Sequence, residues 1–153
     1  MKNLIYIASV LLMLSSCGRE RIFHEKKEVS AQGWRQLDGA AFTTEITDTT
    51  GRYDLVLEVE HERSFSYQNL YLNIITAFPS GEKTEQLLSI EMTDEYGQWI
   101  GDCKGSDCTV VVDLIKGIAF KDPGSYGFEV QQHSREEDLL GIKAISLGIL
   151  AAE

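Results

Sequence analysis

The 153-residue chain has 14 Lys and Arg against 24 Asp and Glu, so its formal net charge is −10. Because like charges repel, this balance excludes nucleic acid and anionic lipid headgroups as the principal partner. The length is that of one domain with its own hydrophobic core, after a short leader at the N-terminus is set aside.

The N-terminus has the pattern of a bacterial lipoprotein leader. Lys2 supplies a positive charge, and residues 4–14 form an apolar run well short of the roughly 20 residues that span a bilayer as a helix. The sequence Leu-Ser-Ser-Cys then ends at Cys17 and resembles the lipobox of bacterial lipoproteins. We predict a signal peptide over residues 1–16 and a lipidated Cys17, whose acyl chains (palmitate among them) are the membrane attachment. The alternative is an ordinary secretory signal with an incidental cysteine.

Residues 17–33 connect the lipid to the remainder of the chain. They are rich in charged residues, and Ile22, Phe23 and Val29 are their only large apolar side chains. This composition predicts an extended tether that precedes a domain over residues 34–153. A second interpretation, equally open from the sequence, is that Ile22 and Phe23 add an edge strand to that domain.

From residue 32 onward, apolar side chains recur at every second position, which is typical of strands with one buried face. In the stretch that begins at Tyr53, this residue shares one face with Leu55, Leu57 and Val59. Strands are predicted over residues 53–60, 69–76, 85–92, 109–115, 126–132 and 142–150.

Turn signals separate these strands, and helix signals are nearly absent. Pro79 and Gly81 follow the second predicted strand, and Pro123 with Gly124 precedes the fifth. Only residues 134–141 have the composition of a helical turn. Short strands at regular spacing predict an all-β fold, an antiparallel β-sandwich of jelly-roll-like type that forms a single domain.

Cys103 and Cys108 lie in a polar loop before the fourth predicted strand. An exported protein enters an oxidising compartment, where a disulfide persists. We predict this bond, at the tip of a hairpin. Two free thiols or part of a metal site are the alternatives, although a zinc site would need further Cys or His ligands nearby.

No catalytic motif can be assembled from the sequence. The histidines occur singly, and His61 and His133 fall at strand ends, where a histidine is most often solvated. Carboxylates are numerous enough to pair by chance, so a glycan hydrolase is kept only as an alternative. A calcium site would draw on loop acids whose spacing matches no known calcium loop, namely Asp94, Glu95, Asp102 and Asp107. We predict no enzymatic activity, no metal and no cofactor.

Several short stretches together resemble the GldH family of gliding-motility lipoproteins from Bacteroidota. The family has a Trp soon after the lipidated Cys, a Tyr-x-Asn-Leu-aromatic-Leu stretch and a Gly-x-Trp-x-Gly turn. It closes with Pro-Gly-x-Tyr, then Gln, Arg and Leu-x-Gly-Ile. The positions that carry the resemblance are Trp34, Phe42, Tyr53, Tyr67, Asn69, Leu70, Tyr71, Leu72, Gly97, Trp99, Gly101, Pro123, Gly124, Tyr126, Gln131, Arg135, Leu140, Gly141 and Ile142. The chain departs from the pattern in lacking a spacer before Gly141, in having His61 where a basic residue is expected, and in its cysteine pair.

The resemblance implies an outer-membrane lipoprotein of the gliding-motility and type IX secretion machinery, with other cell-envelope proteins as partners and no enzymatic activity. The lack of an acidic cluster directly after Cys17 favours a periplasm-facing orientation. We predict an interaction face around Tyr67, Asn69, Tyr71 and Trp99, with Trp99 mostly in the core and Tyr71 more exposed. The alternative is a lipid-anchored carbohydrate- or peptide-binding module, in which these rings form a stacking platform.

Overall fold

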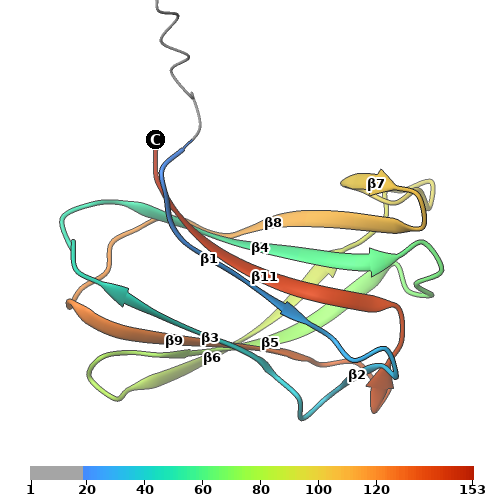
Figure 1. Cartoon of the computed structure of the whole chain (residues 1–153), viewed down its shortest axis with the longest axis horizontal. Coiled ribbons are helices and arrows are strands. Elements are labelled where there is room, and N and C mark those ends of the chain that lie inside the picture. The colour runs from blue at the N-terminus through green and yellow to red at the C-terminus, as the bar shows by residue number, and fades with distance from the viewer. Residues whose placement is uncertain (1–18) are drawn as a thin grey trace, which may run out of the picture.

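The computed structural model describes residues 19–153, and all regular structure in this part of the chain is β-strand. The strands form two antiparallel sheets that pack face to face (Figure 1). The predicted antiparallel β-sandwich is thus confirmed. Within the described residues, no helix is long and apolar enough to span a membrane.

The larger sheet has five strands in the order β1-β11-β4-β8-β7. Their bounds are Arg21–Glu28 for β1, Ile142–Ala151 for β11, Tyr53–Glu62 for β4, Asp107–Ile118 for β8 and Asp102–Lys104 for β7. The sheet therefore places the last strand of the chain in its interior, between β1 and β4.

The smaller sheet has four strands in the order β3-β9-β5-β6. Their bounds are Ala40–Ile46 for β3, Gly124–Gln132 for β9, Asn69–Ala77 for β5 and Lys83–Glu91 for β6, while β2 (Trp34–Arg35) and β10 (Asp138–Leu139) form a separate short pair. With the three shortest strands set aside, this is the strand order of an eight-stranded jelly roll. All six strands predicted from the alternating pattern are present, as β4, β5, β6, β8, β9 and β11.

The core lies between the two sheets and is built from the inward side of each strand. On β4, Tyr53, Leu55, Leu57 and Val59 are buried, as the sequence alternation predicts. They pack with the buried side chains of the facing sheet, among them Phe42, Leu70, Leu72, Tyr126, Phe128 and Val130. Each large apolar side chain removed from water in this way stabilises the fold by about 1.5–3 kcal/mol.

The central strand β11 is buried on both of its faces, which explains its almost continuously apolar sequence. On its outer side, Ser146 is buried although it faces away from the core. Long side chains of the neighbouring strands meet above this side: Lys26 of β1 pairs with Glu60 of β4 at 2.8 Å, and His24 lies 3.4 Å from Glu58. Small residues on β11 leave room for these pairs.

Residues 21–28 form strand β1 at the edge of the larger sheet, where they pair with β11 from Arg21 opposite Leu150 to Glu28 opposite Ala144. Phe23 and Val29 pack against the core. The edge-strand interpretation therefore describes this segment, and the folded domain begins ahead of the predicted boundary at residue 34. The alternation was hard to recognise because charged residues occupy both faces of an edge strand.

Residues 134–141 contain no helix, contrary to the sequence expectation. The buried side chain of Gln132 organises this segment instead: its Nε2 donates to the carbonyl of Glu136 at 2.9 Å, and its Oε1 accepts from the Ser134 N–H at 2.8 Å. The segment then pairs with β2, as Leu139 lies opposite Trp34. These contacts compete with the local hydrogen bonds that a helical turn would make.

Candidate interaction surface

One end of the sandwich, which we call the anchor end, is where the described chain begins. The guanidinium of Arg19 pairs with the carboxylate of Asp54, which also accepts the Gly117 N–H at 2.7 Å. The Ala151 N–H donates to the Glu20 carbonyl at 2.8 Å. Asp54 is buried, so Arg19 supplies the cation that a buried carboxylate needs. The predicted lipidation site, Cys17, lies outside the described residues, two positions before this fastened arginine.

The opposite end carries five of the ten exposed large apolar side chains in the described part of the chain. Strands β1, β4, β6 and β9 all run away from the anchor end, so the connections that follow them gather at the far end (Figure 1). There Leu37 is 86% exposed, Tyr96 79% and Leu140 65%. We define the distal surface as Leu37, Tyr67, Tyr96, Ile100 and Leu140, all of which are exposed. Large side chains of this kind on loops mark surfaces that bind other proteins.

Beneath the distal surface lies a cluster of aromatic rings. The ring centroids of His61 and Trp99 are 4.7 Å apart in an edge-on arrangement, and Phe65 lies 5.8 Å from His61 and 5.6 Å from Tyr67. Trp99 is half-buried and packs against the core. The turn that contains Trp99 needs a glycine at position 101, because a Cβ at that position would overlap the carbonyl oxygen of Thr109.

His61 is fully buried in this cluster, so the expectation of a solvated histidine at the end of its strand was wrong. Its Nδ1 lies 2.9 Å from the Glu62 carbonyl, which can only accept, and therefore carries the proton. Burial lowers the pKa of His61 because the charged imidazolium would lose its hydration. His61 is thus a neutral packing residue whose Nε2 has no hydrogen-bond partner among the described residues.

The structure does not gather the four residues of the predicted interaction face on one surface. Trp99 points inward to the aromatic cluster, whereas Tyr67 is exposed and donates its hydroxyl proton to the Glu136 carboxylate at 3.1 Å. Asn69 and Tyr71 are also exposed, on the side of β5 that faces away from the core. Tyr67 therefore belongs to the distal surface, and Asn69 and Tyr71 extend from it onto the outer side of the smaller sheet.

Cys103 and Cys108 face each other across the β7–β8 hairpin and are joined by a disulfide, with their Cα atoms 4.0 Å apart. The hairpin adjoins the distal end, where Cys108 also lies opposite His61 of β4. The bond therefore closes a hairpin directly beside the aromatic cluster.

We expect the exported protein to contain this disulfide and to depend on it only modestly. Closing so short a loop stabilises by about 2 kcal/mol in the chain-entropy description. Mass spectrometry without reductant should give a mature mass lower by two hydrogen atoms than after reduction. Reaction of both thiols with a maleimide, in protein taken from the envelope without reductant, would contradict the prediction.

The loop acids considered for calcium serve other purposes. The Asp94 carboxylate accepts the N–H groups of Tyr96 and Gln98, both at 2.9 Å, and Asp107 pairs with Lys143 at 2.6 Å. Across residues 19–153, no group of three or more His, Cys, Asp or Glu side chains is placed to hold a metal ion. These carboxylates shape a turn and an ion pair.

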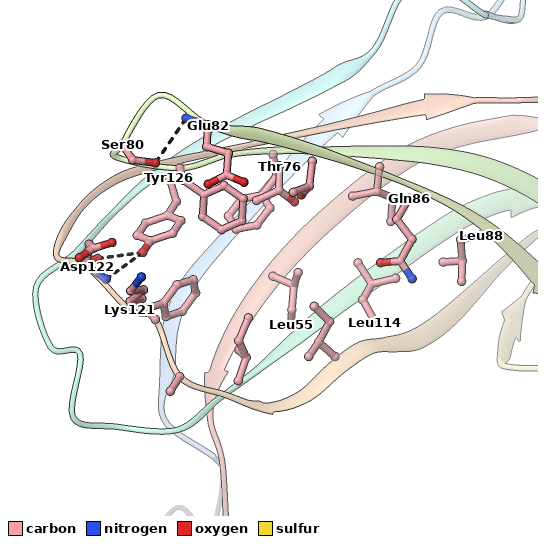
Figure 2. A pocket seen from close by; sticks show the side chains of 18 residues that line it. Leu55, Thr76, Ser80, Glu82, Gln86, Leu88, Leu114, Lys121, Asp122 and Tyr126 are labelled. Atoms are coloured by element: carbon pink, nitrogen blue, oxygen red, sulfur yellow. Dashed lines mark hydrogen bonds between the residues drawn. The ribbon is translucent and has the colours of Figure 1, made fainter.

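A cavity of about 390 Å³ opens between the sheets along β6 and β8. Figure 2 shows its mainly apolar body, with Leu55 and Leu114 on one wall and Leu88 on the other. The charged lining residues Glu82, Lys121 and Asp122 lie with Ser80 toward the anchor end, whereas Gln86 lies farther along, near Leu114 and Leu88. The walls of this cavity come from strands far apart in the chain, so no local sequence pattern indicates it.

Comparison with known proteins decides the family. The sequence model described as GldH lipoprotein matches residues 21–149, from the first residue of β1 almost to the end of β11. The chain belongs to the GldH lipoprotein family. The resemblance noted in the sequence is thereby confirmed.

Two relatives of the GldH family align over most of the chain. A gliding motility lipoprotein GldH homolog from Christiangramia forsetii is 27% identical over 142 residues, which cover 92% of this chain and 86% of the relative. The gliding motility lipoprotein GldH of Flavobacterium johnsoniae is 26% identical over 148 residues, covering 94% of this chain and 87% of the relative. Both GldH alignments thus cover more than nine-tenths of this chain.

Solved structures resemble this GldH-family chain only loosely. A structure of the infectious bursal disease virus Gx strain has a TM-score of 0.40 at 14% identity, over 84% of this chain and 29% of that one. A family GH115 4-O-methyl-alpha-glucuronidase has a TM-score of 0.34 at 8% identity, over 88% of this chain and 18% of the enzyme. The chain thus spans less than a third of either.

Sequence reasoning missed the distal surface of this GldH-family protein, apart from Tyr67. Leu37 and Tyr96 are isolated apolar residues in polar loops, and Leu140 directly follows the buried Leu139. A large apolar residue in a loop with no strand periodicity was the available signal, but single exposed side chains of this kind are common in proteins. Only the fold shows that the connections gather at one end.

Proposed function

We propose that this protein is a non-catalytic docking component of the gliding-motility and type IX secretion machinery. A lipid on Cys17 holds it at the outer membrane, where it faces the periplasm. Membership of the GldH lipoprotein family supports the anchor, and the relatives named gliding motility lipoproteins support the association with gliding.

The observation that carries the proposal is the separation of two specialised ends. Arg19 is held at the anchor end by its ion pair with Asp54. One residue, Gly18, separates Arg19 from Cys17 in the sequence. Two residues span no more than roughly 7 Å, so a lipid on Cys17 holds this end of the sandwich close to the bilayer. The distal surface then points away from the membrane, toward other envelope proteins.

The chemistry of the distal surface favours docking over catalysis. Its defining side chains are aromatic or aliphatic, and aromatic side chains commonly dominate the energetics of protein interfaces. Two nearby carboxylates have structural partners: Glu136 accepts from Tyr67, and Asp94 shapes its own turn. Docking requires a rigid, exposed apolar surface, which the disulfide and the aromatic cluster beneath it support.

We expect Tyr96→Ala and Tyr67→Ala each to weaken capture of an envelope partner by roughly 30-fold, about 2 kcal/mol, while the domain stays folded. A tag at the C-terminus suits the experiment because Ala151 lies at the anchor end and leaves the distal surface free. Tagged protein is recovered from detergent-solubilised outer membranes, and the captured proteins are identified by mass spectrometry.

Val111→Ala is the matched control. Val111 is 60% exposed but lies on β8, on the outer side of the larger sheet. Its truncation should leave capture unchanged. The docking proposal fails if the tyrosine variants and the control capture gliding or secretion proteins equally well. Hydrolysis of a glycan or peptide by the purified protein, lost on changing one carboxylate, would reject the non-catalytic role.

A further inference from the structure

The cavity between β6 and β8 has the form of a binding site for one long apolar group. Its volume of about 390 Å³ is in the range of natural ligand sites, which are apolar with a few polar groups at defined places. Leu88 of β6 and Leu114 of β8 oppose each other across it, and Phe120 of the β8–β9 connection also lines it. A well-packed sandwich of this size would ordinarily fill such a space with side chains.

Two unpaired strand edges border the cavity. In the described part of the chain, β6 pairs only with β5, and β8 beyond Thr109 pairs only with β4. The space is therefore elongated along the strands. The gap in the core packing therefore extends along two strands and is larger than a void left by one small side chain.

The polar mouth of the cavity lies at the anchor end. Ile118 lines the cavity, and the preceding Gly117 donates its N–H to Asp54, the partner of Arg19. Gly124, at the start of β9, lies against Pro79 of the β5–β6 turn, which brings the turn with Ser80 and Glu82 to the same end. With Cys17 in the bilayer, this mouth is at the level of the lipid headgroups.

We propose that the cavity binds a single acyl chain, supplied by an envelope lipid or by the lipid on Cys17 itself. The apolar body takes the methylenes, and the mouth, where Lys121 and Ser80 stand beside Glu82 and Asp122, takes the polar group of the lipid. An extended peptide could pair with one strand edge, but its remaining backbone groups would face the apolar walls unpaired. An acyl chain has no such groups. The inference rests on the proposed anchor at Cys17, because that anchor brings the mouth to the membrane.

Photo-crosslinking in cells tests this inference on the complete protein. Cells are fed palmitate that carries a diazirine, which enters both phospholipids and lipoproteins, and are irradiated before the protein is purified and digested. We expect adducts on β6 and β8 peptides, at residues such as Leu88 and Leu114. The mass of each adduct shows whether the acyl chain came from an envelope lipid or from the lipid on Cys17. A phospholipid adduct on the cavity residues supports the proposal, and so does a cross-link from these residues to the Cys17 peptide.

Two neighbouring leucines provide matched variants. Leu88→Trp places an indole in the cavity, whereas Leu87→Trp places it on the opposite, 65% exposed side of the same strand. Adducts on the cavity residues should fall at least fivefold in Leu88→Trp and stay unchanged in Leu87→Trp, with thermal melting used to verify folding. If Leu88→Trp does not fold, Leu114→Phe is used in its place. The positions of the adducts in the unmodified protein also test the proposal without any variant.

Adducts confined to exposed loops, or an equal yield in both tryptophan variants, would overturn the proposal. A labelled Cys17 without cavity adducts rejects acyl binding but keeps the anchor, whereas an unlabelled Cys17 rejects the anchor. Capture of envelope partners by Leu88→Trp should equal that of the unmodified protein, so a failure here is distinct from a failure of the docking role.

Discussion

Replacing Cys17 by alanine should release the protein from the membrane and abolish its labelling with palmitate. The chain belongs to a family of lipoproteins, and β1 begins at Arg21, two residues after the fastened Arg19. Acyl chains contribute about 0.8 kcal/mol for each methylene buried in the bilayer, and two or more chains are needed for a durable anchor. Without them we expect an uncleaved precursor or a soluble protein. Fractionation and metabolic labelling with palmitate measure the result.

The control uses the other cysteines of the chain. A protein with both Cys103→Ser and Cys108→Ser should keep its palmitate and stay in the membrane fraction, since these residues are joined to each other in the β7–β8 hairpin. Palmitate labelling that survives Cys17→Ala but disappears in the double serine variant would place the lipid elsewhere and refute the anchor.

Trp99→Ala should lower the free energy of unfolding by about 3 kcal/mol, a typical cost of truncating a packed aromatic side chain. Trp99 is half-buried and packs edge-on against His61, with Phe65 as a second neighbour. Its loss opens a void beside a buried histidine that already has one unpaired nitrogen. For a domain of this size we expect a fall in melting temperature of roughly 10 °C, measured by circular dichroism.

Tyr71→Ala is the comparison for this experiment. Tyr71 is 48% exposed on the outer side of β5. Its truncation should lower the free energy of unfolding by less than about 1 kcal/mol, as is usual for surface positions. An unchanged melt of Trp99→Ala together with lost partner capture would show that the Trp99 ring belongs to the interface rather than to the aromatic cluster.

The strands could be predicted because their signal is local. In residues 53–60, apolar side chains recur at every second position, and β4 buries the predicted set of Tyr53, Leu55, Leu57 and Val59. Asp54 and Val56, which lie between them, are buried as well. The same alternation exists in β3, where Ala40, Phe42 and Ile46 are buried, but small and polar residues at the positions between weaken it. Turn residues and the spacing of the strands were then enough to indicate an antiparallel sandwich.

The disulfide and the leader were also local inferences. The four residues between Cys103 and Cys108 suit a hairpin, and the structure joins the two cysteines across one. The start of the domain could not be predicted from local patterns. Residues 21–28 form a strand because they pair with β11, the last strand of the chain.

Local patterns were enough to indicate the fold class, the main strands and the family of this protein, because alternation, turns and short motifs involve residues close together in the chain. Contacts between distant segments determine instead that His61 is buried, that Trp99 and Tyr71 point to different sides, and that the exposed loops gather at the end opposite Arg19. The cavity between β6 and β8 likewise has walls from strands distant in sequence. The physical reason is that burial and cavity shape depend on which strands pair and how two sheets pack, and a jelly roll makes those contacts between distant segments.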